Sequence, residues 1–314
     1  MLIDTDAANE IDDPFAIAWA LLAPEQLDVQ AIYAAPYSFA HRRDALVQRL
    51  GRPPKDESPF VTPAEGMARS VDTIEAVCAA AGWPTAGRVL RGATGYMAAP
   101  DAPQRCDAVE HLIATARATP EDGPPLYVLA LGCPTNVSSA LAAAPDIARR
   151  LVVVWTAAYP SHAPHANSSF NFEQDVHATR VLFDSGVPLV YLPGYHVGAQ
   201  LRFSWPEAEA YLQGRGPLAQ HLFELYTHNP LWELAGVEGP FAHSWVIWDL
   251  ICVAWLLNPD WVPSTLVRTP GVDDALRWTH PEGRPWMREA HVVQRDAIFG
   301  DLLRRLHAHG AARD

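Results

Sequence analysis

The sequence predicts an α/β fold with a mostly parallel, Rossmann-like central sheet and helices on both of its faces. Strand-like apolar segments alternate with helical segments along most of the chain, which is the pattern of a parallel sheet. One of these segments, LYVLALG, is almost continuously apolar, as in strands that are buried on both faces. No repeat or linker divides the chain, so a single domain over residues 1–314 is expected.

The elements follow in order from the N-terminus. MLID reads as a short buried strand, and a helix follows over residues 14–23, with Asp12 or Asp13 as its cap and Pro14 in its first turn. LDVQAIYAA reads as the second strand. Residues 36–63 are polar and rich in Pro, Arg and Ser, so a long loop is expected there.

The rest of the chain continues the alternation. Strands are expected at residues 126–132, 151–158 and 187–193. Helices are expected at residues 63–82, 106–118, 134–150, 175–186, 249–257 and 295–310, with two or three more between Trp205 and His228.

Composition narrows the possible partners. The net charge of −13 argues against a nucleic-acid partner, because phosphates need basic groups to neutralise them. No apolar run reaches the roughly 18 residues of a membrane span, and the start is too short and acidic for a signal peptide. The four scattered cysteines fit reduced thiols, so a cytoplasmic protein with a small-molecule partner is expected.

Five acidic residues crowd the junction between the first strand and the first helix: Asp4, Asp6, Glu10, Asp12 and Asp13. Open α/β sheets bind ligands at the carboxyl ends of their strands, where this junction lies. Carboxylates packed so closely repel one another, and their pKa values rise unless a cation is present. Ca²⁺, which takes about six to eight oxygen ligands, would relieve the repulsion.

Three other interpretations of this acidic junction exist. A solvated loop with a helix cap explains one or two of the acids. LIDTD also supplies the DxD of a haloacid dehalogenase-type phosphatase, which would hold Mg²⁺, although Ala7 and Ala8 do not fit its hydroxyl pattern. In an EF-hand loop, Asp4 and Asp6 would fit, but Ala8 and Asn9 stand where a ligand and the turn glycine belong.

A fourth interpretation rests on a longer motif. DTDAANEIDDPFAIAWALL resembles the N-terminal signature of the inosine-uridine preferring nucleoside hydrolase family, which is DxD, a spacer, DD and an apolar helix. The spacer here has five residues, 7–11, and is longer than usual, as in a divergent branch with an NEIDD-type motif. Further segments resemble family motifs in the same order: LYVLALGCPTNVSSAL, VVVWTAAY, SSFNFEQDVHATRVLF, SWVIWDLICVAWLLNPDW and RDAIFGDLLRRL.

This resemblance implies a Ca²⁺-dependent N-ribohydrolase, with the metal held by Asp6, Asp13, Asp249 and the carbonyl of Leu131. The reaction would cleave the N-glycosidic bond of a ribonucleoside through an oxocarbenium-like transition state. The metal would lower the pKa of the attacking water and hold the ribose 2′- and 3′-hydroxyls, and Asp6 would act as general base. Relatives usually form homodimers or homotetramers, and a role in nucleoside salvage is expected.

The resemblance also implies the groups that contact substrate. Asp12 and Asn171 would bind the sugar, Asn167 is a candidate second sugar amide, and Trp248 could stack on the base. Simpler roles stay open for three residues. Asp249 would be only a helix cap, Asn171 a turn residue, and Asn136 a helix-start amide.

The chain departs from the family pattern at two functional positions. Ser169 replaces the glutamate that meets the 5′-hydroxyl, and Glu173 cannot be assumed to take over. Trp248 replaces a histidine that protonates the leaving base. The candidates for the missing acid are His243, His165 and Glu10, and a leaving group that departs with little protonation would need no acid.

A third departure is the segment of residues 36–63, with His41, Arg42 and Arg43, which stands where the family has a Gly-Asn turn. The departures leave base specificity open. They also keep an alternative function open: a family member that binds or hydrolyses a different riboside, or a non-catalytic Ca²⁺ and nucleoside-binding protein.

Overall fold

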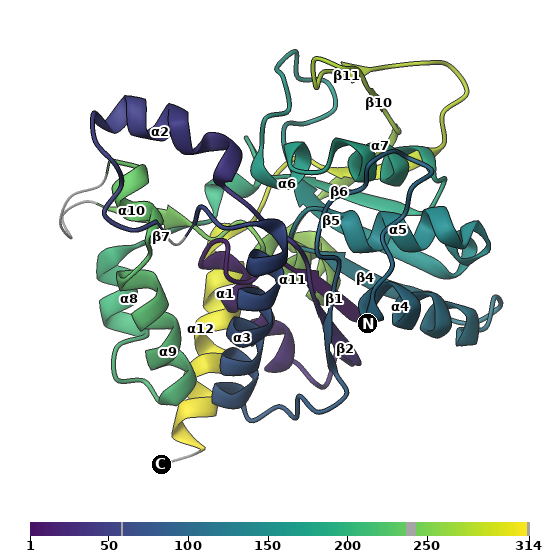
Figure 1. The fold of residues 1–314 in the computed structure, drawn as a ribbon. Helices are drawn as coiled ribbons and strands as arrows, with labels where there is room; N and C mark the ends of the chain where they lie inside the picture. Colours follow the sequence, from purple (N-terminus) through teal and green to yellow (C-terminus); the bar gives the residue numbers. More distant parts are fainter. Residues whose placement is uncertain (58, 237–242, 313–314) are drawn as a thin grey trace.

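The computed structural model describes residues 1–57, 59–236 and 243–312 (Figure 1). Its centre is an eight-stranded sheet in the order β3-β2-β1-β4-β5-β6-β12-β9. Every neighbouring pair is parallel except β12 with β9, so the predicted fold class is confirmed. The strands are β1 (Leu2–Thr5), β2 (Ala31–Ala34), β3 (Val89–Arg91), β4 (Leu126–Ala130), β5 (Leu151–Ala157), β6 (Leu189–Pro193), β9 (Ser264–Arg268) and β12 (Trp286–Ala290).

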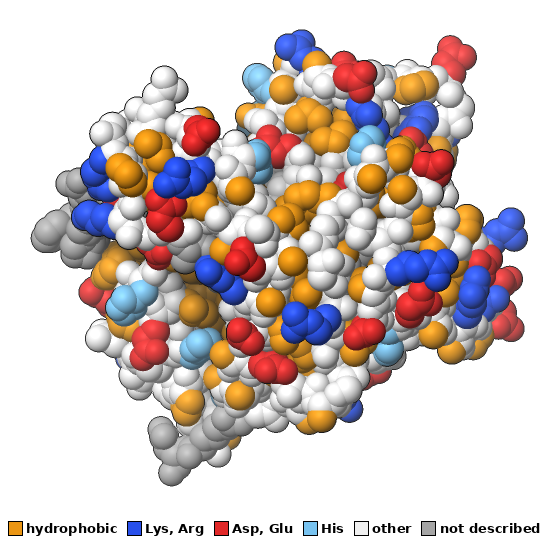
Figure 2. All heavy atoms as spheres, in the orientation of Figure 1, with side chains coloured by type: hydrophobic (Ala, Val, Ile, Leu, Met, Phe, Trp, Pro, Cys, Tyr) orange, Lys and Arg blue, Asp and Glu red, His pale blue; other side chains and the backbone are white. Residues whose placement is uncertain are grey.

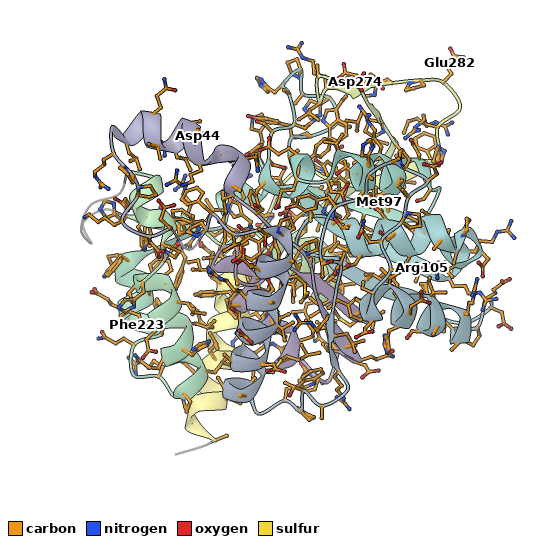
Figure 3. The ribbon with its side chains drawn as sticks, in the orientation of Figure 1. Asp44, Met97, Arg105, Phe223, Asp274 and Glu282 are labelled. Atoms are coloured by element: carbon orange, nitrogen blue, oxygen red, sulfur yellow. The ribbon has the colours of Figure 1, made fainter. Side chains whose placement is uncertain are left out.

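Helices cover both faces because successive strand residues point to opposite sides. Ile3 of β1 packs into one apolar core and its neighbour Leu2 into the other. The first core is closed by α1 (Asp12–Leu21), α3 (Pro63–Ala81), α9 (Pro217–Thr227), α11 (Leu250–Leu257) and α12 (Arg295–Ala311). The second is closed by α4 (Asp107–Ala118), α5 (Thr135–Ala143) and α7 (Val176–Asp184). Figure 3 shows side chains filling the space between these helices and the sheet.

Smaller elements lie around this core. The remaining helices are α2 (Arg43–Leu50), α6 (Phe170–Glu173), α8 (Trp205–Tyr211) and α10 (Leu231–Leu234). Two short antiparallel pairs join β7 (Arg202–Ser204) to β8 (Ser244–Val246), and β10 (Gly271–Val272) to β11 (Trp278–Thr279).

The chain reverses its direction of travel across the sheet between β1 and β4, as the strand order shows. From β1 the chain runs outward through β2 and β3, and from β4 it runs outward the other way through β5 and β6. The loops after β1 and β4 therefore part in opposite directions and leave a crevice, which is where such sheets bind ligands. The acidic junction follows β1, and Leu131 follows β4.

Three predicted elements differ from the structure. Asp12 and Asp13 do not cap α1: Ile11 precedes the helix without a side-chain cap, and both aspartates belong to its first turn. Residues 36–63 are not all loop, since α2 forms within them and ends at Gly51 with φ 69°. The predicted helix over residues 134–150 ends at Ala143, and a 3₁₀ segment (Pro145–Arg150) completes it.

Within the described parts of the chain, no helix is long and apolar enough to cross a bilayer. On the face drawn in Figure 2, basic and acidic side chains are interleaved and no continuous basic patch forms among the described residues.

Candidate functional site

An open cavity lies at this crevice, and its volume is about 610 Å³ when the part open to solvent is counted. The polar and aromatic residues that line it come mainly from loops after several strands and from the starts of helices: Asp6, Asn9, Glu10, Asp12, Asp13, Arg42, Thr156, Ser169, Phe170, Asn171, Tyr195, Trp248 and Asp249. The backbone of Leu131 reaches it as well.

Three buried carboxylates meet at one end of the cavity. Asp12 and Asp13 stand in the first turn of α1, and Asp249 directly precedes α11, which packs against α1. One oxygen of each lies within 4.8 Å of the others. Segments more than 230 residues apart in the chain therefore form one acidic site, and Asp249 makes no side-chain cap bond to its own helix.

Asp6 lies beside this trio and is held by its own neighbours. Its carboxylate accepts a hydrogen bond from Asn9 Nδ2 at 3.2 Å. A Cβ added at Gly132 would lie 2.8 Å from Asp6 Cγ, so glycine at that position lets the loop after β4 approach Asp6. Thr5 donates a hydrogen bond to Asp13 and fixes that carboxylate in turn.

Burial raises the pKa of every carboxyl group in this cluster. Burial is the main cause for Asp6, Asp12 and Asp249, whose pKa values lie well above 3.8, and neighbouring carboxylates add to it. Burial raises the pKa of Asp13 to about 6, with the hydrogen bond from Thr5 opposing the rise. It raises the pKa of Glu10 to about 7, against the hydrogen bond from Trp245. A bound cation would remove this cost of ionisation.

The donor set fits a hard divalent cation. All side-chain donors at this end of the cavity are oxygens, as a hard cation prefers. Asp12 Oδ1 is buried and has no hydrogen-bond partner among the described residues, and neither has Thr156 Oγ1. Buried oxygens without partners are rare unless something else binds them.

Calcium and pH should act together on stability. Because the folded-state pKa values of Asp13 and Glu10 exceed their ordinary 3.8 and 4.5, the folded state binds more protons between about pH 4 and 7. The unfolding free energy of the metal-free protein should therefore fall as pH rises through this window. For each of the two groups, the fall is about 1.4 kcal/mol per pH unit between its unfolded and folded pKa values.

We expect a lower melting temperature at pH 8 than at pH 5 in chelator, and a larger rise on adding Ca²⁺ at pH 8. The carboxylates are ionised and repel one another at the higher pH, so the cation has more repulsion to relieve there. Equal Ca²⁺ effects at both pH values in differential scanning calorimetry would contradict this.

The competing interpretations of the acidic junction do not agree with this geometry. Asp6, Asp12 and Asp13 are buried, not solvated. Asp4 does not line the cavity and accepts a hydrogen bond from Asn136 at 2.7 Å, so the two aspartates of the phosphatase-like DxD do not share one site. α1 begins inside the stretch that an EF-hand loop would occupy. Asn136 also accepts from the Ala93 amide at 2.9 Å, which makes it a structural amide at the start of α5.

Comparison with known proteins decides the family. The model of the inosine-uridine preferring nucleoside hydrolase family matches residues 1–296. The chain belongs to this family. Its enzyme class, N-ribohydrolase, is thereby confirmed at the level of the family.

Individual relatives of this nucleoside hydrolase differ in base preference. The pyrimidine-specific ribonucleoside hydrolase of Klebsiella pneumoniae is 27% identical over 89% of this chain and 86% of its own length. The pyrimidine-specific ribonucleoside hydrolase of Citrobacter koseri is 28% identical over 57% of this chain and 55% of its own length. A purine-preferring ribonucleoside hydrolase from Gardnerella vaginalis, at 18% identity, superposes with a TM-score of 0.74 over 99% of both chains. The shared fold therefore does not set the base.

Asn171 of this nucleoside hydrolase is more than a turn residue. It stands in α6 and lines the cavity, and its Nδ2 donates to the carbonyl of Leu131 at 2.5 Å and, at 3.4 Å, to that of Thr156. The Leu131 carbonyl keeps a second lone pair for a further ligand.

Asn167 is not part of the cavity. It is fully buried, its Oδ1 accepts from the Tyr159 amide at 3.2 Å, and its Nδ2 donates to the Leu276 carbonyl at 2.9 Å. Because both ends of its amide bind backbone, the structure does not place it with the other predicted sugar ligands.

Of the three candidates for the leaving-group acid, Glu10 lines the cavity and the two histidines do not. His165 is exposed and packs on Tyr159 outside the cavity, with ring centres 4.8 Å apart. His243 does not line the cavity either. Glu10 does, and Trp245 Nε1 donates to it at 3.2 Å. Trp248 lines the cavity and packs edge-on against Tyr195, with ring centres 6.0 Å apart.

Among the residues that line the site, sequence reasoning assigns no role to Arg42, Thr156 or Tyr195. Thr156 and Tyr195 stand at or just after the carboxyl ends of β5 and β6, where the rule that located the acidic residues also applies. Arg42 carries no comparable signal, because it follows the second strand at a distance.

Proposed function

We propose that the protein hydrolyses the N-glycosidic bond of a ribonucleoside and uses Ca²⁺ as its cofactor. The observation that carries this proposal is the buried, oxygen-only cluster of Asp12, Asp13 and Asp249 beside Asp6, in the cavity at the reversal point of the sheet. Family membership supports the reaction class.

Asp13, Asp249, Asp6 and the Leu131 carbonyl would hold the cation, and Asp12 lies within reach of the same ion. Bound Ca²⁺ would lower the pKa of the attacking water and would bind the ribose 2′- and 3′-hydroxyls. Asp6 would accept the proton of that water. Asn171 would accept a hydrogen bond from a sugar hydroxyl through Oδ1, since its Nδ2 already donates to the Leu131 and Thr156 carbonyls. Trp248 would stack on the base.

Asp12 would accept a hydrogen bond from a ribose hydroxyl and stabilise positive charge on the ring. A unit charge pair about 4 Å apart at an effective dielectric constant of about 20 is worth roughly 4 kcal/mol. That energy corresponds to roughly a thousandfold in rate if it is gained mainly in the oxocarbenium-like transition state. The carboxylate is therefore placed to favour the charged transition state over the neutral substrate.

The release of ribose tests this function. Metal-free and Ca²⁺-loaded protein would be incubated with a panel of purine and pyrimidine ribonucleosides, and reducing sugar would be measured. Ribose from at least one nucleoside, lost on chelation, supports the proposal. Bound Ca²⁺ with no ribose from any nucleoside would favour the alternative, a protein that binds a riboside without cleaving it.

Glu10 is the candidate acid that lies in the cavity, so we assign protonation of the leaving base to it. Glu10→Gln should lower kcat on the preferred nucleoside by about 10²- to 10⁴-fold, the usual contribution of general acid catalysis. The loss on p-nitrophenyl ribofuranoside, whose leaving group needs no proton, should be at least about tenfold smaller. Equal losses on both substrates would remove Glu10 from this role.

A further inference from the structure

Arg42 is the one Lys or Arg side chain among the described residues that line the cavity. It ends a 3₁₀ turn (Ala40–Arg42) in the segment of residues 36–63, which departs from the family pattern. A cation at the rim of a cavity whose floor is lined by carboxylates needs an explanation.

The guanidinium of Arg42 is held rigidly on one edge. Its Nε and Nη2 donate to Glu173 Oε1 at 2.8 and 2.5 Å, and Nη2 also donates to the Ser168 carbonyl at 2.8 Å. It lies over the rings of Phe170 and Phe39, 5.5 and 6.0 Å from their centres. Nη1 makes no hydrogen bond to any residue that the structure describes. One N–H₂ group of a fixed guanidinium beside the cavity therefore has no hydrogen-bond partner among the described residues.

The charges around Arg42 determine whether this N–H₂ group can bind an anionic or a neutral ligand. Glu173 neutralises Arg42, and Glu10 and the aspartates bring further negative charge to the same cavity. An anionic ligand such as a phosphate would meet net repulsion, whereas a neutral oxygen acceptor would not. Nη1 therefore suits a carbonyl oxygen.

Arg42 lines the same cavity as Tyr195 and Trp248. Burial raises the pKa of Tyr195, and the positive charge of Arg42 opposes that rise. Tyr195 packs edge-on against Trp248, the residue proposed to stack on the base. A base lying on Trp248 would present its edge toward Tyr195 and Arg42.

We propose that Arg42 determines base specificity, with Nη1 donating to an exocyclic carbonyl oxygen of the base and Glu173 positioning the guanidinium. The inference rests on the proposed hydrolase function. The preferred substrates are ribonucleosides whose base carries such a carbonyl group, over the same base without it.

The test compares pairs of nucleosides that differ at this carbonyl. Inosine is paired with purine riboside, which lacks the 6-oxo group, and uridine with pyrimidin-2-one riboside, which lacks the 4-oxo group. For each pair that the protein cleaves, the measured quantity is kcat/KM for the nucleoside with the carbonyl group divided by kcat/KM for the nucleoside without it. Arg42→Met should lower this ratio by about 10- to 100-fold, because the substrate loses a hydrogen bond from a charged donor. Glu173→Gln should lower the same ratio to a smaller extent, because it frees the guanidinium.

Arg43→Met is the matched control, since the neighbouring Arg43 pairs with Glu57 and does not line the cavity. This variant should keep the wild-type ratio. If Arg42→Met also keeps the wild-type ratio while ribose is still released, the inference fails and the proposed hydrolase function stands. If the wild-type protein releases ribose from no nucleoside, both fail. Unfolding curves of all variants would show that any change in ratio is not a loss of fold.

Discussion

Asp6→Asn is expected to lower kcat for ribose release by about 10³-fold or more, while the protein stays folded. Asparagine keeps the shape of the side chain but cannot accept the proton of the attacking water, and a lost general base costs about 10²- to 10⁴-fold. The loss of one carboxylate would also weaken the hold on Ca²⁺. Since the buried Asp6 carboxyl has a raised pKa, its removal should not destabilise the metal-free fold. Steady-state kinetics at saturating Ca²⁺ would measure the effect.

Asp44→Asn is the control for this variant. Asp44 is an exposed aspartate on α2, labelled in Figure 3, and does not line the cavity. It should behave as wild type. Turnover by Asp6→Asn within a few-fold of wild type would remove Asp6 from the reaction.

Asp249→Asn should abolish both activity and the stabilisation of the fold by Ca²⁺. A ligand present at about 100 times its dissociation constant stabilises the folded state by about 2.7 kcal/mol, and this increment should disappear with the site. Asp249 tests the site well because its carboxylate joins those of Asp12 and Asp13 from the late part of the chain. Melting temperatures with and without Ca²⁺, together with metal analysis of the purified protein, would measure the loss.

Asp4→Asn is the matched control for Asp249→Asn. Asp4 is as buried as Asp249, and burial raises its pKa to about 7, but it faces Asn136 outside the cavity. This variant should keep the Ca²⁺-dependent rise in melting temperature. If Asp249→Asn kept the same rise, the proposed metal site would be in the wrong place.

The fold could be predicted where burial leaves a strong pattern. β4, β5 and β6 lie in the middle of the sheet, so their sequences are almost wholly apolar. β9 and β12 were missed because β9 is the edge strand and both strands expose several residues, among them Leu266 and Trp286. α2 was missed because prolines and polar residues surround it. Leu46 and Leu50, four residues apart and packed on a small apolar cluster, were the signal for a helix.

The site could be predicted only in part, because position along the chain does not determine which way a side chain points. Asp13 and Asp249 each precede or open a helix at the same edge of the sheet, so the topology alone brings them together. Asn167 stands near Asn171 in the chain, but contacts with Tyr159 and Leu276 turn its amide away. The position of Arg42 depends on its pairing with Glu173, about 130 residues later, which no local pattern encodes.

A Ca²⁺ titration of the metal-free protein would test whether the protein needs a metal bound at the acidic cluster to hydrolyse nucleosides. Ribose release from the preferred nucleoside would be followed at each step. We expect no release in chelator and a rise that saturates with one Ca²⁺ bound per chain, and no such rise for Asp249→Asn. Full ribose release in the presence of chelator, with no Ca²⁺ bound, would contradict the proposed role of the cluster.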